Sequence, residues 1–164
     1  MVSVTESPEF LYHGTVSDNL PSIYGFGLSA DWSMHLKGVY LTDDPLLAEY
    51  FAERTAEGGG DPVVIKVPIT PQLRSGLRGD RKMLMDPTVM QTHDPDVVME
   101  LLRSGTTSWR KTLEAVHSVI YRGSDPIRVT PDMVTRIRER RFARFPEVGR
   151  FRRVRVKSYQ RQRR

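Results

Sequence analysis

A histidine, a glycine and two tyrosines are the residues of this sequence whose types and spacing best suit ligand chemistry. His13 and Gly14 follow a short apolar and aromatic stretch, residues 9–12, which predicts a strand ending there. A polar side chain and bare backbone amides at a strand end can hold a small ligand. Tyr40 and Tyr50 lie on either side of an expected helix start, so the two rings could enclose a flat ring.

Several common chemistries lack the residues they need. The chain has no cysteine, which excludes disulfides, thiolate metal sites and cysteine nucleophiles. Its histidines show no His-x-x-x-His spacing, and Asp94, in the densest group with His93 and Asp96, is better explained as a helix cap. The glycine-rich motifs of Rossmann and P-loop nucleotide sites are absent, as is the Gly-x-Ser-x-Gly of serine hydrolases. We therefore expect no metal site, no Rossmann or P-loop nucleotide site and no serine hydrolase site.

Short strands and helices follow one another in an irregular order, in which strands dominate. Short apolar runs predict four strands, at residues 9–12, 38–41, 62–69 and 116–121. Capping residues predict three helices, beginning near residues 17–19, 42–45 and 94–95, and glycines end each of them. Residues 70–92 look irregular. This order favours an α+β fold over a regular βαβ repeat.

Length and composition favour one globular domain. The chain has 164 residues, of which 38% are hydrophobic, so it can bury a core. No segment approaches 18 consecutive apolar residues, and the first ten residues do not resemble a secretory signal. We therefore expect no membrane partner, and a cytoplasmic location.

Basic residues are concentrated at the C-terminal end. Residues 136–164 hold 13 basic and two acidic side chains, whereas residues 1–135 carry a net charge of −6. We call residues 136–164 the basic arm and expect it to contact a polyanion such as nucleic acid, or only to aid solubility. Thr130 and Pro131 predict a helix start just before it, and the alternation of apolar and cationic residues predicts a strand over residues 151–157.

Together these residues resemble the ADP-ribosyltransferase superfamily, in its diphtheria-toxin-like and poly(ADP-ribose) polymerase-like branch, whose signature is His, Tyr and Glu on three strands. The family pattern runs from a His-Gly-(Ser/Thr) motif through an Asn and a Gly-(Phe/Leu) turn to a Gly-(Ile/Val)-Tyr strand and an Ala-x-Tyr helix. The matching residues here are His13, Gly14, Thr15, Asn19, Gly27, Leu28, Gly38, Val39, Tyr40, Ala48 and Tyr50. The match covers residues 11–52 well and residues 116–134 loosely. The interval from Tyr40 to Tyr50 is one residue shorter than in the family.

The resemblance implies a fold, a co-substrate and a reaction. The fold would be a split, mainly antiparallel β-sandwich with short flanking helices, formed by residues 1–135. NAD would be the co-substrate, and ADP-ribose would pass to a macromolecular acceptor, which could be DNA, RNA or protein. The bond between nicotinamide and ribose would break through an oxocarbenium-like state, which a carboxylate is suited to stabilise.

The resemblance also implies roles for individual residues. His13 would hydrogen-bond the adenosine-side ribose, and the Gly14 backbone would hold the nicotinamide carboxamide. Thr15 and Asn19 would contact the adenosine half. The nicotinamide ring would stack between the two tyrosines.

The catalytic Glu of the family has no direct counterpart here. When residues 119–121 are aligned with the late strand of the family, His117 occupies the Glu position. Glu114 lies three residues earlier, where a bulge or a shifted register would bring it into the site. A neutral His117 could itself hydrogen-bond the ribose or act as a base. From the sequence, Glu114, His117 or neither of them completes the site.

Three other functions remain open. The RNA 2'-phosphotransferase family shares the fold and a His-Gly-Thr start, and its late strand and helix resemble residues 118–134. That family has a His where Tyr40 stands, and an RNA-binding lobe before the motif, whereas only 12 residues precede His13. The missing Glu would also suit a catalytically silent module that binds NAD or nucleic acid. A structural nucleic-acid-binding protein would bind nucleic acid with a steep salt dependence and would have no NAD affinity.

Overall fold

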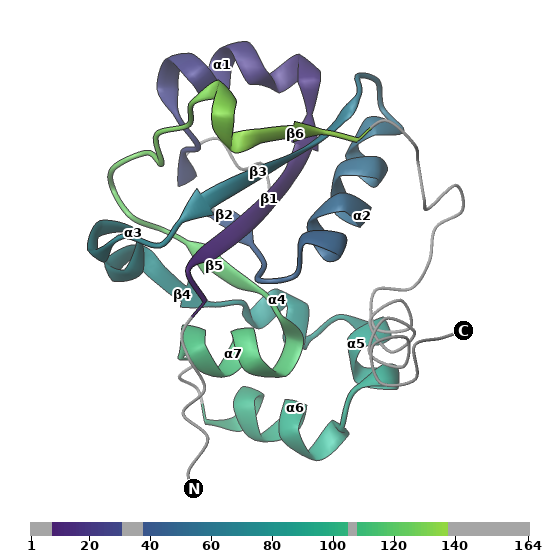
Figure 1. Cartoon of the computed structure of the whole chain (residues 1–164). Helices are drawn as coiled ribbons and strands as arrows, with labels where there is room; N and C mark the ends of the chain where they lie inside the picture. Colours follow the sequence, from purple (N-terminus) through teal and green to yellow (C-terminus); the bar gives the residue numbers. More distant parts are fainter. Residues whose placement is uncertain (1–7, 31–37, 105–107, 138–164) are drawn as a thin grey trace, which may run out of the picture.

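Two three-stranded antiparallel sheets lie at the centre of the computed structural model, which describes residues 8–30, 38–104 and 108–137 (Figure 1). The first sheet has the order β1-β3-β6, with β1 at Phe10–Val16, β3 at Pro62–Pro68 and β6 at Val134–Arg136. The second has the order β2-β5-β4, with β2 at Val39–Leu41, β5 at Val119–Tyr121 and β4 at Leu77–Gly79. Every pairing within the two sheets is antiparallel, which confirms the α+β class.

The two sheets are joined at one point. The Tyr12 N–H donates to the Thr42 carbonyl at 2.8 Å, and the Thr42 N–H donates back to the Tyr12 carbonyl at 3.0 Å. Beyond this bridge β1 continues along β3, so that His13 pairs with Ile65, while β2 continues along β5. The residues next to the bridge therefore lie where the two sheets separate.

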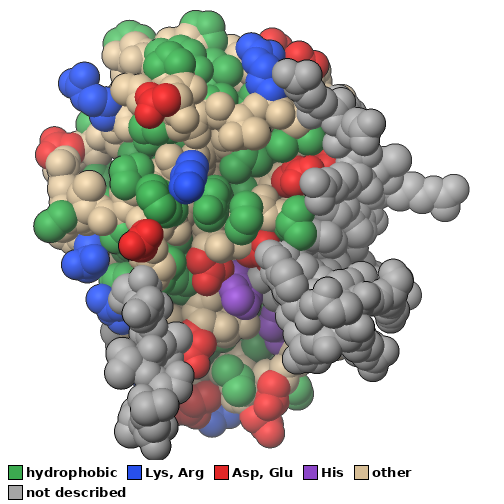
Figure 2. Space-filling view, viewed as in Figure 1, with side chains coloured by type: hydrophobic (Ala, Val, Ile, Leu, Met, Phe, Trp, Pro, Cys, Tyr) green, Lys and Arg blue, Asp and Glu red, His purple; other side chains and the backbone are tan. Residues whose placement is uncertain are grey.

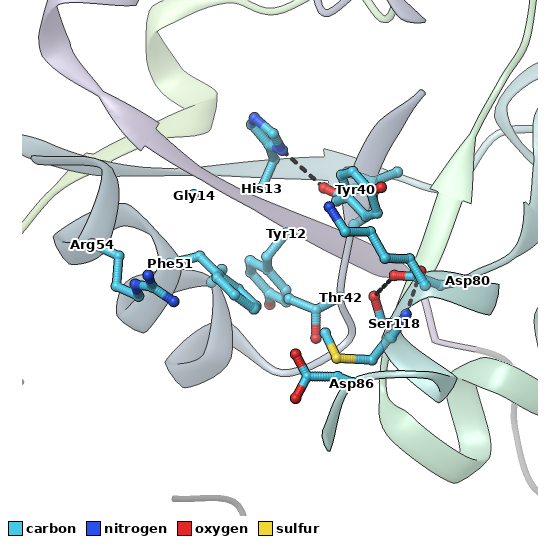
Figure 3. A pocket seen from close by; sticks show the side chains of 14 residues that line it. Tyr12, His13, Gly14, Tyr40, Thr42, Phe51, Arg54, Asp80, Asp86 and Ser118 are labelled. Atoms are coloured by element: carbon cyan, nitrogen blue, oxygen red, sulfur yellow. Dashed lines mark hydrogen bonds between the residues drawn. The ribbon is translucent and has the colours of Figure 1, made fainter. Parts of the chain in front are cut away.

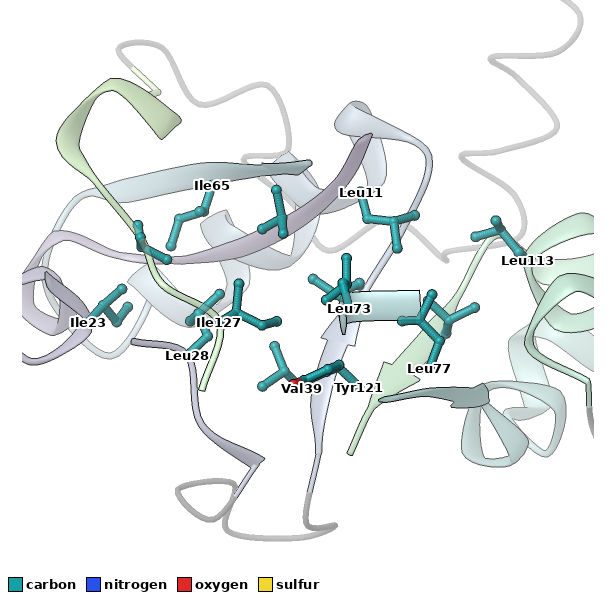
Figure 4. Close-up of a cluster of buried hydrophobic side chains, with 14 residues drawn as sticks. Leu11, Ile23, Leu28, Val39, Ile65, Leu73, Leu77, Leu113, Tyr121 and Ile127 are labelled. Atoms are coloured by element: carbon teal, nitrogen blue, oxygen red, sulfur yellow. The ribbon is translucent and has the colours of Figure 1, made fainter. Parts of the chain in front are cut away.

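One hydrophobic core is shared by both sheets (Figure 4). It is made of aliphatic side chains and Tyr121, and its strand residues are Leu11, Ile65, Val67, Val39, Leu41, Leu77, Val119 and Tyr121. Side chains from both sheets are almost fully removed from water, as in Ile65 and Val119 at 0% exposure. Burial of this apolar surface fixes the position of one sheet against the other.

The first two helices begin and end where capping chemistry predicts. The first follows a 3-10 turn (η1, Ser17–Asn19): α1 spans Leu20–Phe26 and ends at Gly27, whose φ of 80° suits glycine. Helix α2 spans Pro45–Ala56, and the Asp44 side chain accepts the Leu46 N–H at 3.0 Å. It lies against β1 and β3 in the first sheet (Figure 1).

The irregular structure predicted for residues 70–92 was wrong. That segment contains α3 (Pro71–Gly76), β4, α4 (Arg81–Leu84) and α5 (Pro87–Thr92). Thr70 caps α3 by accepting the Leu73 N–H, with Pro71 at the first helical position. Each of these elements has six residues or fewer, which is too short for a periodic pattern to be recognised.

Helices α6 (Pro95–Arg103) and α7 (Trp109–Val116) pack with α4 and α5 at one end of the molecule (Figure 1). Their shared core is a small separate cluster of Leu84, Val89, Val98, Leu101 and Val116. Because α7 continues to Val116, the strand predicted from residue 116 begins only at Val119.

The end of the described chain forms a strand rather than the predicted helix. Pro131–Met133 makes a single 3-10 turn (η3), and β6 then pairs with β3, with Thr135 opposite Val64. The β-branched Val134 and Thr135 favour this pairing. The boundary expected between residues 135 and 136 falls within β6, and the strand expected over residues 151–157 lies outside the described residues.

The prediction that Asp94 is a helix cap can be tested directly at the start of α6. The Asp94 side chain accepts the Asp96 N–H at 2.9 Å. We expect Asp94→Ala to lower the free energy of unfolding by about 1 kcal/mol, because a helix N–H then loses its partner. Urea denaturation measures the change, with Asp96→Ala as the exposed neighbouring control. Equal losses in the two variants would contradict the cap.

Candidate functional site

A cavity of about 380 Å³ opens where the two sheets separate (Figure 3). Its wall is built from β1, β2, α2, the segment from Asp80 to Asp86, and the residue before β5. The lining residues are Tyr12, His13, Gly14, Tyr40, Leu41, Thr42, Ala48, Phe51, Arg54, Asp80, Lys82, Met83, Asp86 and Ser118. Three residues of the sequence-derived site, His13, Gly14 and Tyr40, therefore share one cavity although they come from two sheets.

His13 is held in one tautomer by β2. Its Nδ1 lies 2.8 Å from the Tyr40 carbonyl oxygen, and a carbonyl can only accept, so Nδ1 carries the proton (Figure 3). Burial lowers the pKa of His13 below 6.5 and so favours the neutral ring. The hydrogen bond to Tyr40 has a smaller effect in the opposite direction. The neutral ring leaves Nε2 as a hydrogen-bond acceptor for a ligand hydroxyl.

Gly14 is required by the packing of α2. A Cβ built at this position would lie 2.1 Å from the Ala48 carbonyl oxygen and 2.8 Å from the Ala52 nitrogen. Only a residue without a side chain lets the α2 backbone approach β1 this closely. The glycine of the motif thus has a structural role in addition to the ligand contact that the sequence suggested.

Tyr40 brings an unpartnered hydroxyl to the site. The oxygen is buried and has no hydrogen-bond partner among the described residues, although its ring is only partly buried. Burial raises the pKa of Tyr40, the nearby Asp80 charge raises it further, and Arg122 acts in the opposite direction. A neutral phenol of this kind can donate to a ligand, which would satisfy the buried oxygen.

The aromatic residue that α2 brings to the cavity is Phe51 rather than Tyr50. Tyr50 is fully buried beside Leu47, and burial raises its pKa to about 12. Phe51, the next residue of α2, lines the cavity together with Tyr12. One residue along a helix turns the side chain by about 100°, because the helix has 3.6 residues per turn. The sequence interval from Tyr40 to Tyr50 is one residue shorter than in the family pattern. The interval from Tyr40 to Phe51 is one residue longer and equals the interval of that pattern.

Thr15 and Asn19 lie away from the cavity lining. The Asn19 side-chain amide donates to the Thr15 hydroxyl at 3.0 Å, which ties the start of α1 to β1. Neither residue lines the cavity. Their observed contact is structural, and the adenosine contact suggested by the resemblance stays a prediction.

The two candidates for the missing Glu also lie outside the cavity lining. Glu114 is exposed on α7, and His117 ends that helix in a left-handed conformation with φ of 56°. The His117 Nδ1 lies 2.8 Å from an Asp43 carboxylate oxygen. The alternation that placed His117 on a strand was wrong, because His117 is the C-cap of α7 and β5 begins only at Val119.

Asp80 and Ser118 are two of the cavity residues that the sequence analysis missed. Asp80 follows β4 and Ser118 precedes β5, two neighbouring strands of the second sheet. The Ser118 hydroxyl donates to Asp80 Oδ2 at 2.5 Å (Figure 3). Asp80 belongs to the segment taken as irregular. A cap-competent Asp ahead of a short helix was the available signal, because its side chain accepts the Met83 N–H.

Charged side chains of both signs complete the cavity wall. Arg54 from α2 and Lys82 from α4 bring positive charge, and Asp86 brings negative charge. Cations at such a wall can contact phosphate oxygens of a ligand. Within the described residues, no three histidine, aspartate or glutamate side chains are arranged to hold a metal ion.

The described surface shows no large basic region on the face in view. Figure 2 shows lysine and arginine side chains that lie apart from one another on that face. The basic arm, where we expect contact with a polyanion, includes Arg136 and Ile137 as its only described residues. No helix in the described ranges is both long and apolar enough to span a membrane.

Comparison with known proteins gives no independent assignment. No protein-family model matches the chain, and no curated protein matches its sequence.

Proposed function

We propose that the chain is a mono-ADP-ribosyltransferase that transfers ADP-ribose from NAD to a macromolecular acceptor. The observation that carries the proposal is the meeting of His13, Gly14 and Tyr40 in one cavity between two antiparallel sheets. These residues lie 27 positions apart in the sequence at most, yet they belong to different sheets, and they are the ones on which the resemblance to the ADP-ribosyltransferase superfamily depends.

The chemistry of the lining suits a dinucleotide. His13 offers an acceptor for a ribose hydroxyl, and the Tyr40 hydroxyl, which has no partner among the described residues, offers a donor. Tyr40 and Phe51 provide aromatic surface for a flat ring, and Arg54 and Lys82 provide positive charge for phosphates. A cavity of about 380 Å³ is within the usual range for ligand sites.

The proposed reaction is a substitution at the nicotinamide-bound ribose carbon. The bond between that carbon and the nicotinamide nitrogen breaks, and its electron pair leaves with nicotinamide. A nucleophilic atom of the acceptor then bonds to the carbon and loses its proton to solvent. Positive charge develops on the ribose in between, so a negative charge or a hydrogen-bond acceptor beside the ribose lowers the barrier.

The test is incubation of the full chain with labelled NAD and separate pools of DNA, RNA and protein. Nicotinamide release and label transfer are read together. Release with label on one pool supports the transferase and identifies the acceptor class. Measurable NAD binding without release or transfer would replace the proposal with a silent binding module, and no NAD binding at all would overturn it.

The basic arm makes a nucleic acid, or a protein bound to one, our proposed acceptor. Its charge would release counterions from a polyanion. Deleting Phe151–Arg164 is expected to lower nucleic-acid affinity and flatten its salt dependence, while NAD affinity stays unchanged. Filter binding at several salt concentrations measures the first effect and calorimetry the second. If the deletion leaves nucleic-acid affinity unchanged, the deleted segment does not bind nucleic acid and only aids solubility.

NAD affinity should depend on the charge of His13. The pKa of His13 lies below 6.5, so the ring is neutral at pH 7–8 and its Nε2 can accept from the ligand. As pH falls through this lowered pKa the ring takes up a proton, this acceptor is lost, and the Kd for NAD should rise. Calorimetry from pH 8 to pH 5 checks this, with His13→Gln as the comparison. Weakening that begins above pH 6.5, or weakening of equal size in His13→Gln, would contradict it.

A further inference from the structure

The cavity wall contains a buried carboxylate paired with a buried hydroxyl. Asp80 is 0% exposed and Ser118 is 4% exposed. The Ser118 hydroxyl donates to Asp80 Oδ2 at 2.5 Å, and the Met83 N–H donates to Asp80 Oδ1 at 3.0 Å. Both residues line the cavity beside Tyr40 (Figure 3).

Capping alone does not account for this pair. Asp80 caps α4, but this helix has only four residues, and one side-chain oxygen is enough for the cap. The Asp94 cap of α6 does the same work from the exposed surface. Burying a carboxylate costs more free energy than a single cap hydrogen bond returns, and a cap does not require that burial.

The hydrogen bonds around Asp80 suit its ionised form. Both of its oxygens accept, one from a hydroxyl and one from a backbone N–H, and a carboxylate is an acceptor only. No arginine or lysine within the described ranges forms an ion pair with it. Burial has the largest effect and raises the pKa of Asp80, and the hydrogen bonds from Ser118 and Met83 and the charge of Lys82 oppose this rise without cancelling it. Among the described residues, the contacts that favour the ionised form are therefore hydrogen bonds and not an ion pair.

Ser118 is oriented by this carboxylate. Because its proton is directed at Asp80, the lone pairs of its oxygen remain to accept a hydrogen bond from a ligand. A hydroxyl that donates to a carboxylate is also a stronger acceptor, since the two hydrogen bonds polarise each other. Ser118 directly precedes β5, one residue after the position where His117 was expected to replace the missing Glu.

We propose that Ser118, oriented by Asp80, is the third functional group of the cavity and accepts a hydrogen bond from a hydroxyl of the nicotinamide-side ribose. The inference rests on the proposed function. Ser118 touches the substrate and is the catalytic residue, whereas Asp80 acts through it and is a positioning residue. When nicotinamide leaves with the electron pair of the broken bond, positive charge develops on the ribose, and the chain of hydroxyl, Ser118 and Asp80 stabilises it. No proton needs to reach Asp80 in this step.

The test compares the rate of nicotinamide release at saturating NAD with the Kd for NAD. We expect Ser118→Ala and Asp80→Asn to lower the rate at least about tenfold and to change the Kd less than about threefold, because the lost interaction forms fully only in the transition state. Ser118→Thr keeps the hydroxyl and should retain most of the rate. The matched controls are Ser75→Ala, an exposed hydroxyl on α3, and Asp94→Asn, the exposed cap.

Each outcome decides between the inference and the proposed function. If Ser118→Ala and Asp80→Asn both release nicotinamide at the wild-type rate, the inference is overturned, but the proposed transferase activity is not. Wild-type protein that neither binds NAD nor releases nicotinamide would overturn both. If Asp80→Asn does not fold in thermal unfolding, the rates of Ser118→Ala and Ser118→Thr decide. A large loss in Glu114→Gln or His117→Gln, with Ser118→Ala unaffected, would assign the role elsewhere.

Discussion

Gly14→Ala is expected to destabilise the fold by about 3 kcal/mol or more, at the upper end of what overpacking costs. The added methyl group would lie 2.1 Å from the Ala48 carbonyl oxygen and 2.8 Å from the Ala52 nitrogen. Both contacts are with the backbone of α2, which cannot move aside as a flexible side chain can. Helix α2 would have to shift away from β1, and its side chains would lose packing contacts with the first sheet.

Urea denaturation of Gly14→Ala measures this loss, and Gly25→Ala is the matched control. Gly25 lies within α1, and a Cβ there meets nothing within 4 Å. The control should be unchanged or more stable by about 0.5–1 kcal/mol, since alanine favours helix more than glycine does. A Gly14→Ala variant as stable as the wild type would show that α2 does not lie this close to β1.

His13→Ala is expected to weaken NAD binding by about 1–3 kcal/mol, or roughly 5- to 150-fold in Kd. The substitution removes the Nε2 acceptor, and it also releases the Tyr40 carbonyl from its hydrogen bond with Nδ1. Calorimetric titration of NAD into the two proteins gives the difference directly, and thermal unfolding shows whether the variant remains folded.

His93→Ala is the control for His13→Ala. The His93 ring also approaches a backbone carbonyl, with Nδ1 3.2 Å from the Val89 oxygen, but His93 does not line the cavity. Its replacement should leave the Kd for NAD unchanged. Equal affinities in wild type and His13→Ala would count against the cavity as the NAD site.

The strands and helices that carry His13, Gly14 and Tyr40 could be predicted because their signals are local. Capping residues such as Asp44, followed by Pro45, identify a helix start within a few residues, and Gly27 identifies a helix end. Short apolar runs identified β1, β2 and β3. These signals need no knowledge of what packs against them, which is why β2, β3, α1 and α2 were predicted close to their observed bounds. The first strand was predicted to end at residue 12, whereas β1 continues through His13 and Gly14 to Val16.

The rest of the site depends on packing between distant segments. Nothing local in the sequence shows that Asp80 would meet Ser118, because the contact forms only when β4 and β5 pair. Helix α7 was missed, although Trp109, Leu113 and Val116 have helical spacing, and its last residue was taken as the start of the late strand. Tyr50 was assigned to the site from the Ala-x-Tyr match, whereas the structure places Phe51, the next residue, at the cavity.

The most direct test of the central claim is a crystal structure of the chain with an NAD analogue whose glycosidic bond cannot be cleaved. We predict the analogue in the cavity between the sheets, with a ribose hydroxyl on His13 Nε2 and the nicotinamide ring against Tyr40 and Phe51. An analogue bound elsewhere, or an empty cavity at a saturating concentration of the analogue, would contradict the account.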